Sequence, residues 1–338
     1  MSEPGRRRAP GRWWLVGLAL VGAGLVLAPF VFRMFDRAPK GATMISQFRP
    51  YMTAARLNGF QQELRQIDAG VHESQTRVAA YLGGRPAANA GSRFAARYPD
   101  FASFAREWPG IDSDMTGMLD TIQANVGNYR AVAALPSFTL FPWFFVAPGL
   151  VLLVLVAVTA GRREWWRTTR WLVVALGVGL IAAPAVFRMF DRAPRGETMM
   201  NAFKTIETRR RVEAIQGYFG EMASGQGAVR LELVPALERA GLSRSQISQR
   251  FPAVDTLDRE WVPILNDFTP MIGTMSDNVV NYDAVASLPP FGLFPWFFVL
   301  PGLLVVGLAF FAGSRRERAR ATAATAANSD PTQPEGAP

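Results

Sequence analysis

Four long runs of apolar residues, separated by polar stretches of very different length, dominate the pattern along this chain. The first run, Trp13 to Phe32, carries no charge, and as a helix it reaches about 30 Å, enough to cross the hydrocarbon core of a bilayer. The third run is the shortest and can span if Arg170 and Arg188 extend toward the headgroups. The pattern therefore predicts four transmembrane helices, at residues 13–32, 138–160, 171–187 and 291–312.

The long stretches that follow the first and third runs have the periodicity of helices. Apolar residues recur three and four apart from Ile45 to Val71, from Met115 to Val132 and from Phe268 to Tyr282. Pro50 is expected to kink or restart the first of these helices. Each stretch is expected to form a hairpin of two long helices, and the two hairpins are expected to pack as a four-helix bundle.

The chain contains the same unit twice. Pro29–Gly41 returns as Pro184–Gly196, and Leu140–Val146 returns as Leu293–Val299. A recurrence of this kind indicates a duplicated structural unit. Each copy holds two spans, an even number, so both copies enter the membrane from the same side and the repeat is parallel rather than inverted.

These patterns together predict an all-α integral membrane protein. Its fold class is a tandem parallel duplication of one unit, in which a transmembrane helix, an extracytoplasmic helical hairpin and a second transmembrane helix follow one another. The first repeat covers residues 13–161, with its outer domain at 33–137, and the second covers 171–313, with its outer domain at 188–290.

Short basic segments orient this arrangement. Residues 1–12, the link 162–170 and the start of the segment 314–338 are all rich in arginine. The positive-inside rule places all three in the cytoplasm, so both termini are expected inside and both outer domains outside. The final segment has too little apolar content to fold alone and is expected to be a disordered tail. A cleaved signal peptide is the rival interpretation of residues 1–32, but no small-x-small cleavage site follows.

Composition narrows the chemistry. The chain has no cysteine and one histidine, His72, which disfavours thiolate, iron–sulfur and zinc sites. It has no phosphate-binding glycine loop and no Ser-His-Asp set, so no catalytic residue, metal or cofactor is expected and the protein is not expected to be an enzyme. The four runs contain no ionisable residue, which disfavours ion-coupled transport.

Charge points to lipid rather than nucleic acid. The net charge of +9 comes almost wholly from arginine, a bias typical of a GC-rich bacterial genome. The basic residues cluster at the ends of the apolar runs and belong to no nucleic-acid-binding motif. The expected location is the bacterial plasma (inner) membrane, as a multi-pass protein, with membrane lipids as partners and nucleic acid excluded.

Three sets of residues are candidates for function. The first is the charged cluster that follows each odd-numbered run: Arg33, Asp36, Arg37, Arg188, Asp191 and Arg192. On a helix the Asp can pair with the preceding and following Arg. At the headgroup level such arginines suit a lipid phosphate, which guanidinium binds in bidentate fashion. The alternative is an anchor that fixes where the span ends.

The second set opens each even-numbered run. Its members are aromatic and proline residues: Pro142, Trp143, Pro148, Pro295, Trp296 and Pro301. They are typical of the aromatic belt at a membrane interface. Kinked helices with prolines at matched depth are a second possibility, because they could open a lateral pocket for a lipid tail.

The third set lies in the outer domains, where the two copies have diverged more. Trp108 and Trp261 follow matching Arg-Glu pairs, and Tyr129 and Tyr282 follow matching asparagines. Matching positions of the two copies are 155 residues apart in the block Pro29–Gly41 and 153 residues apart in this third set. The set is interpreted either as a buried structural core or as the wall of a ligand pocket.

The expected function is non-catalytic. We expect an accessory or scaffolding protein of the cell envelope, whose paired ectodomains meet a lipid, another envelope protein or a second copy of the chain. One alternative is an extracellular ligand sensor that signals through a separate partner. Another is a component of a lipid or small-molecule transporter. No resemblance to a known family supports any of the three.

Overall fold

The computed structural model describes residues 13–83, 90–161 and 166–311, and these ranges contain no strand. The chain divides into two compact units. The span unit comprises the described residues up to Pro39, Leu135–Pro194 and those from Leu288 onward, and the bundle unit comprises Lys40–Ala134 and Arg195–Ser287. The basic N-terminus, residues 84–89, part of the basic link and the C-terminal tail lie outside the described residues.

The span unit contains four helices that are long and apolar enough to cross a membrane, which indicates a multi-pass membrane protein. No more than a third of each apolar window is buried inside the protein, so the spans present apolar side chains outward, as helices in lipid do. The structure thus has a long apolar helix at each of the four places where the sequence predicts a span, with ends that differ by a few residues. The spans are α1 (Trp13–Val31), α8 (Phe141–Gly161), α9 (Trp166–Val186) and the fourth span, Phe291–Phe311.

The helix α9 begins earlier than the sequence predicts. It includes Arg170 within its first turns instead of starting after it. The guanidinium of Arg170 lies over the rings of Trp171 and Phe310, at 5.8 and 5.4 Å from their centres. Cation–π contacts of this kind make an arginine tolerable beside an apolar segment.

Glycines bring the spans together in pairs. A Cβ atom on Gly149 of α8 would lie 2.9 Å from the carbonyl oxygen of Gly22 on α1. In the same way, a Cβ atom on Gly302 of the fourth span would lie 2.7 Å from the carbonyl oxygen of Gly177 on α9. Only glycine permits helices to approach this closely. The two crossings occupy matching positions of the chain, offset by 155 residues on one helix and 153 on the other.

Aromatic rings at matching positions meet inside the span unit. Phe145 and Phe298 stack with their ring centres 4.5 Å apart, and Phe141 meets Phe294 edge-on at 5.8 Å. All four belong to one buried cluster with Leu25 and Leu180. This cluster packs the α1–α8 pair of helices against the α9–fourth-span pair.

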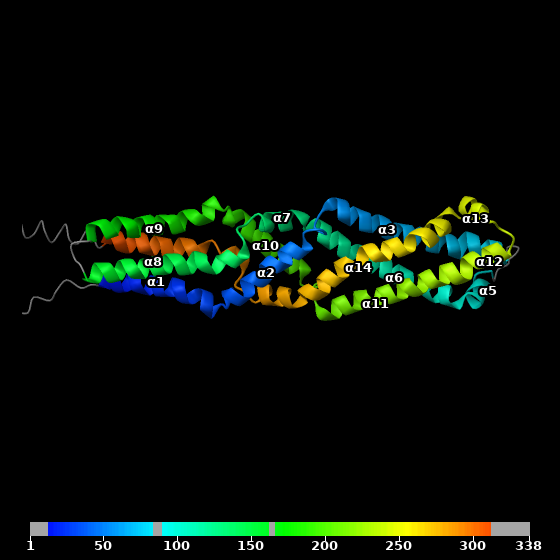
Figure 1. Ribbon diagram of the computed structural model, residues 1–338, viewed down its shortest axis with the longest axis horizontal. Coiled ribbons are helices and arrows are strands. Elements are labelled where there is room, and N and C mark those ends of the chain that lie inside the picture. The colour runs from blue at the N-terminus through cyan, green and yellow to red at the C-terminus, as the bar shows by residue number, and fades with distance from the viewer. Residues whose placement is uncertain (1–12, 84–89, 162–165, 312–338) are drawn as a thin grey trace, which may run out of the picture. The chain divides into compact units, whose positions relative to one another are not determined.

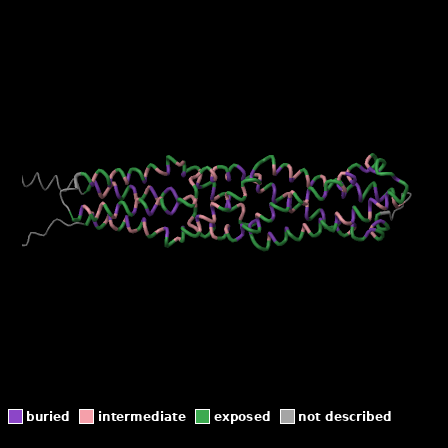
Figure 2. Tube along the Cα trace, viewed as in Figure 1, coloured by how far each residue is buried: buried purple, intermediate pink, exposed green. Residues whose placement is uncertain are grey.

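The bundle unit is built on four long helices, labelled in Figure 1: α3 (Ala54–Glu73), α6 (Pro99–Ala124), α11 (Arg209–Ala228) and α14 (Pro252–Ala286). Helices α3 and α11 each contact both α6 and α14. Along these helices, buried residues recur at intervals between exposed ones (Figure 2), because each helix turns one apolar stripe inward.

Shorter helices complete the described fold, so each stretch contains more helices than the two long ones that the sequence predicts. In the first stretch they are α2 (Met34–Phe48), α4 (Ala79–Gly83), α5 (Ala90–Arg97) and α7 (Val126–Ala133). In the second they are α10 (Met189–Phe203), α12 (Val234–Arg239) and α13 (Arg244–Arg250). Single π-helical turns, Ser74–Val78 and Val229–Leu233, follow α3 and α11, and 3-10 turns, Phe138–Leu140 and Phe291–Leu293, precede α8 and begin the fourth span.

The break near Pro50 is present, but proline alone does not explain it. The second stretch breaks at the matching place between Phe203 and Arg209, where Thr205 replaces the proline. In both stretches the next helix starts with a threonine whose side chain accepts a hydrogen bond from a backbone N–H, Thr53 from Arg56 and Thr208 from Arg211. The shared N-cap therefore gives a common reason for the break.

Candidate lipid site

Arg33 separates α1 from α2 through an unusual backbone conformation. Its φ is 52°, in the left-handed region, and Arg188 has a φ of 54° between α9 and α10. These two arginines are the only non-glycine residues with positive φ in the described part of the chain. A helix commonly ends with such a residue, but glycine usually occupies the position, because a Cβ atom there costs about 1–2 kcal/mol.

This break changes the expected geometry of the charged cluster. Because the helix stops before Arg33, Arg33 and Asp36 do not lie on one continuous helix, and the same holds for Arg188 and Asp191. Arg37 folds back instead, and its Nη1 donates to the carbonyl oxygen of Phe32 at 3.2 Å. Arg192 donates to Phe187 in the same way, at 3.3 Å. Arg37 and Arg192 therefore satisfy backbone carbonyls at the ends of the spans.

Arg33 and Arg188 have a different environment. Both side chains are exposed, and neither forms a hydrogen bond or ion pair with any residue that the structure describes. The residue that follows each arginine is buried, since Met34 and Met189 are 4% and 2% exposed. The left-handed turn thus presents a guanidinium outward while the next side chain enters the core.

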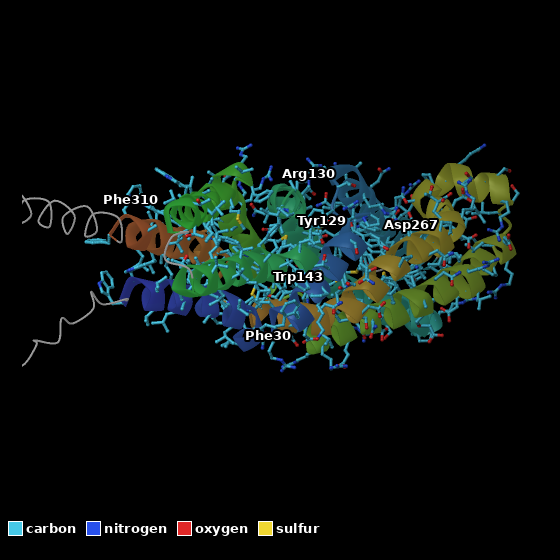
Figure 3. All side chains as sticks on the ribbon, turned by 60° about the vertical axis from the view of Figure 1, so that its left-hand side comes forward. Phe30, Tyr129, Arg130, Trp143, Asp267 and Phe310 are labelled. Carbon is cyan, nitrogen blue, oxygen red and sulfur yellow. The ribbon has the colours of Figure 1, made fainter. Side chains whose placement is uncertain are left out.

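The structure brings the first two predicted sets of residues together. Trp143 of α8, labelled in Figure 3, meets the ring of Phe35 edge-on at 5.5 Å, two residues beyond Arg33. Trp296 meets Phe190 in the same geometry at 5.8 Å. Across the halves, Phe32 stacks on Phe297 at 6.4 Å. The arginine segments and the aromatic–proline segments therefore form common surroundings in the span unit.

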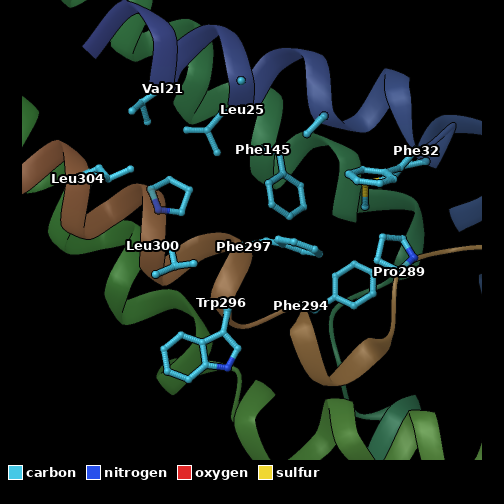
Figure 4. A pocket seen from close by; sticks show the side chains of 14 residues that line it. Val21, Leu25, Phe32, Phe145, Pro289, Phe294, Trp296, Phe297, Leu300 and Leu304 are labelled. Carbon is cyan, nitrogen blue, oxygen red and sulfur yellow. The ribbon is translucent and has the colours of Figure 1, made fainter. Parts of the chain in front are cut away.

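A cavity of about 320 Å³ lies between α1 and the fourth span (Figure 4). Phe32 and Met34, the two neighbours of Arg33, line one part of it. Trp296 and Pro301 of the second predicted set line another part. The lining side chains carry almost no polar atoms, so the cavity suits an apolar ligand.

A second cavity of about 320 Å³ lies between α8 and α9. It is lined at the matching positions, with Phe187 and Met189 beside Arg188, and with Trp143 and Pro148 from α8. Each cavity therefore combines the arginine segment of one half of the chain with the aromatic–proline segment of the other half.

Glycine creates part of the space in both cavities. Gly24 lines the first and Gly179 the second, and a Cβ atom built on either would contact nothing within 4 Å. These two glycines differ from Gly22 and Gly177, which lie at helix crossings. The sequence shows all four glycines, but only the structure separates those that permit contact from those that leave space.

The third predicted set lies in the interior of the bundle unit. Trp108 and Trp261 are 1% and 0% exposed, and the ring of Phe104 lies between 5 and 6 Å from both. The hydroxyls of Tyr129 and Tyr282 donate to the carbonyl oxygens of Ile45 and Met200. Burial raises the pKa of both tyrosines, that of Tyr282 to about 12. These contacts support the structural interpretation over a ligand pocket.

Polar clusters occur on the two faces of the bundle. On α6 and α11, Asp114 accepts from Arg211 and Tyr218, and the arginine holds the pKa of Asp114 below its usual range. At the matching place on α3 and α14, Arg56 donates to Asp267 at 3.0 Å, and Glu63 lies beside them. Burial and the adjacent Asp267 raise the pKa of Glu63 to about 7. The pairs join helices from the two halves of the chain.

Sequence reasoning missed the cavity-lining methionines Met34 and Met189, whose only signal was their place inside the repeated segments. Gly24 and Gly179 line the cavities and have open space at their Cβ positions, so they do not serve close helix approach. No group of three or more His, Asp or Glu residues that could hold a metal occurs in the described part of the chain. Comparison with protein-family models, with curated proteins and with solved structures finds no match for this chain.

Proposed function

We propose that this chain is a non-catalytic membrane protein of the bacterial cell envelope that binds two phospholipids, one in each cavity of the span unit. One observation carries this proposal. In each half, an exposed arginine lies in the sequence between two residues whose side chains line an apolar cavity. Phe32 and Met34 flank Arg33, and Phe187 and Met189 flank Arg188.

This juxtaposition matches the chemistry of an amphipathic lipid. An acyl chain transfers favourably into an apolar cavity, and about 320 Å³ is within the size range of small-molecule sites. A phosphate suits the planar donors of a guanidinium, which can bind two of its oxygens at once. Since Arg33 and Arg188 have no side-chain partner among the described residues, their donors are available to such a headgroup.

A tandem parallel duplication would explain why the site occurs twice. The left-handed arginines, the glycine crossings, the threonine N-caps and the π-helical turns all recur at matching positions. In this proposal each half is a unit of span, helical hairpin and span, and the two halves combine to complete each cavity.

The proposed orientation follows from the basic segments. With residues 1–12 in the cytoplasm, α1 leaves the inner face of the plasma membrane and Arg33 reaches the outer headgroups. The cavities then open toward lipids of the outer leaflet, both termini are cytoplasmic and the bundle unit is extracytoplasmic. The bundle is the surface we assign to a protein partner or a second copy of the chain.

Native mass spectrometry of the gently extracted protein tests this proposal. Gly24→Leu and Gly179→Leu each place a side chain into open cavity space without meeting a neighbour at the Cβ position. We expect two bound phospholipids in the natural protein, one in either single variant and none in the double variant. Retention of two lipids in the folded double variant would refute the proposal.

A matched control comes from the fourth span. Gly307 also has open space around its Cβ position, but it lines neither cavity. Gly307→Leu adds the same side chain to a membrane helix and should leave both lipids bound. If this variant loses lipid as the double variant does, the effect is not specific to the cavities.

A further inference from the structure

The bundle unit contains a small cavity of about 10 Å³, lined by residues from matching positions of the two halves. Phe48 and Phe203, the last residues of α2 and α10, line it together with residues from the two helix breaks that follow. Met52 and Glu207 come from those breaks and occupy matching positions in the duplicated sequence. Met271 and Met275 of α14 complete this methionine–glutamate cavity.

Glu207 is an acidic residue in a cavity that is otherwise lined mainly by apolar side chains. It is 3% exposed, as is Met52 at the matching position, and its Oε2 has no hydrogen-bond partner among the described residues. Burying a polar group without a partner is unfavourable, whereas an apolar side chain at the same place would not be. In the first half of the chain an apolar side chain, that of Met52, occupies the matching position. The acid therefore indicates a ligand that this cavity receives.

The size and lining of the cavity restrict the ligand. A volume of about 10–15 Å³ admits one water-sized occupant. A buried water molecule typically makes about three hydrogen bonds, and the lining side chains offer two polar groups, the Glu207 carboxyl and the Tyr51 hydroxyl. The three methionines offer thioether sulfurs instead, which are soft ligands that favour Cu(I) over hard cations.

We propose that Met52, Met271, Met275 and Glu207 form a binding site for one soft monovalent metal cation of the Cu(I) class. The carboxylate neutralises the charge of the ion, which matters most where water is excluded. The thioethers supply neutral donors that complete the coordination. This site is independent of the two lipid cavities.

Silver is the probe for the test, because Ag(I) has the same charge and ligand preference without redox chemistry. We would titrate the purified full chain with Ag(I) and follow binding by native mass spectrometry and by thermal unfolding. One ion per chain and a rise in melting temperature are expected. Absence of a one-to-one complex would overturn the proposal.

Variants identify the ligands. Met271→Leu with Met275→Leu keeps the apolar volume but removes two sulfurs, and Glu207→Gln removes the charge while keeping the shape. Each should weaken Ag(I) binding by about tenfold or more. Met222→Leu is the matched control, since Met222 is 1% exposed on α11 and does not line the cavity. Equal affinity in all variants, or an equal loss in the Met222→Leu control, would also overturn the proposal.

Discussion

The backbone at Arg33 and Arg188 is where single residues bear most directly on the proposed function. A left-handed residue with a side chain costs about 1–2 kcal/mol relative to glycine, and the chain accepts this cost at both matching positions. Glycine would serve the turn alone. In the proposed site, the guanidinium gives a reason for arginine at these positions that the conformation alone does not.

Arg33→Gly with Arg188→Gly separates the two roles. Glycine adopts the left-handed conformation without a steric penalty, so we expect the melting temperature to change little, while binding of anionic phospholipid weakens. Arg33→Ala with Arg188→Ala keeps a Cβ atom in the left-handed conformation, as the natural arginines do, so it should lose the same binding and be less stable than the glycine variant by about 1 kcal/mol for each residue. Thermal unfolding and lipid counting on the same samples distinguish these outcomes. Unchanged lipid binding in the glycine variant would remove the arginines from the site.

Glu207 and Glu63 give the bundle unit a specific pH dependence. Burial raises the pKa of Glu207 to about 8, and burial together with Asp267 raises that of Glu63 to about 7. The folded state therefore holds these protons more tightly than the unfolded chain, where a glutamate titrates near pH 4.3. Their contribution to stability is complete below about pH 4 and is lost as the pH rises through about 7 and 8.

We predict that the metal-free bundle unfolds at lower temperature at pH 9 than at pH 6. Glu207→Gln cannot ionise, so it should remove much of this difference, on the order of several kcal/mol of unfolding free energy for a fully buried acid. Glu260→Gln, at an exposed position of α14, is the control and should keep the dependence. The same pH dependence in Glu207→Gln as in the natural protein would show that Glu207 is not its source.

At the scale of helices, close glycine crossings hold the spans in pairs. Gly149 and Gly302 lie where a Cβ atom would approach backbone oxygen atoms of the partner helix to 2.9 and 2.7 Å. Backbone atoms cannot move aside as a flexible side chain can. The glycine pairs therefore set the distance between α1 and α8 and between α9 and the fourth span.

Gly149→Leu or Gly302→Leu should separate the paired helices and destabilise the span unit by about 1–3 kcal/mol, the usual effect of overpacking. The measurement is thermal unfolding of the purified protein. Gly307→Leu, with open space at its Cβ position, should be nearly neutral. A melting temperature as high in Gly149→Leu as in Gly307→Leu would contradict this account of the crossings.

Some elements could be predicted from the sequence and others could not. The four spans were accessible because an uncharged run of about 20 apolar residues has few alternatives to a membrane helix. The left-handed break at Arg33 was not, since the sequence has no glycine there to indicate it. The break near Pro50 was expected for its proline, yet its recurrence beside Thr205 points to the threonine caps.

The candidate site could likewise be predicted only in part from the sequence. The arginine and aromatic–proline segments stood out because they recur, but their contact through Trp143 and Phe35 depends on tertiary packing. The cavities also depend on it, because each joins segments from opposite halves of the chain. The burial of Glu207 left no sign in the local sequence, where an acid beside Thr208 is typical of a helix start.

Viewed as a whole, the chain pairs matching positions within each of its two units. Phe145 meets Phe298 in the span unit, and Met52 and Glu207 line one cavity in the bundle unit. Where the sequences of the halves differ, a hydrogen bond can be lost. The indole of Trp108 donates to Asp68 at 3.2 Å. Ala223 occupies the position that matches Asp68 in the second half, and Nε1 of Trp261 has no hydrogen-bond partner among the described residues. Two matching lipid sites are what this pairing predicts for the span unit.

Photo-crosslinking tests that claim most directly. An anionic phospholipid with a diazirine in its acyl chain would be activated in membranes that contain the full chain, and the modified residues would be mapped by mass spectrometry. Crosslinks should concentrate at both cavities, at residues such as Leu300 and Ala147, and disappear in Gly24→Leu with Gly179→Leu. Crosslinks spread evenly over exposed span residues such as Leu20 and Val154, and unchanged in the double variant, would contradict the account.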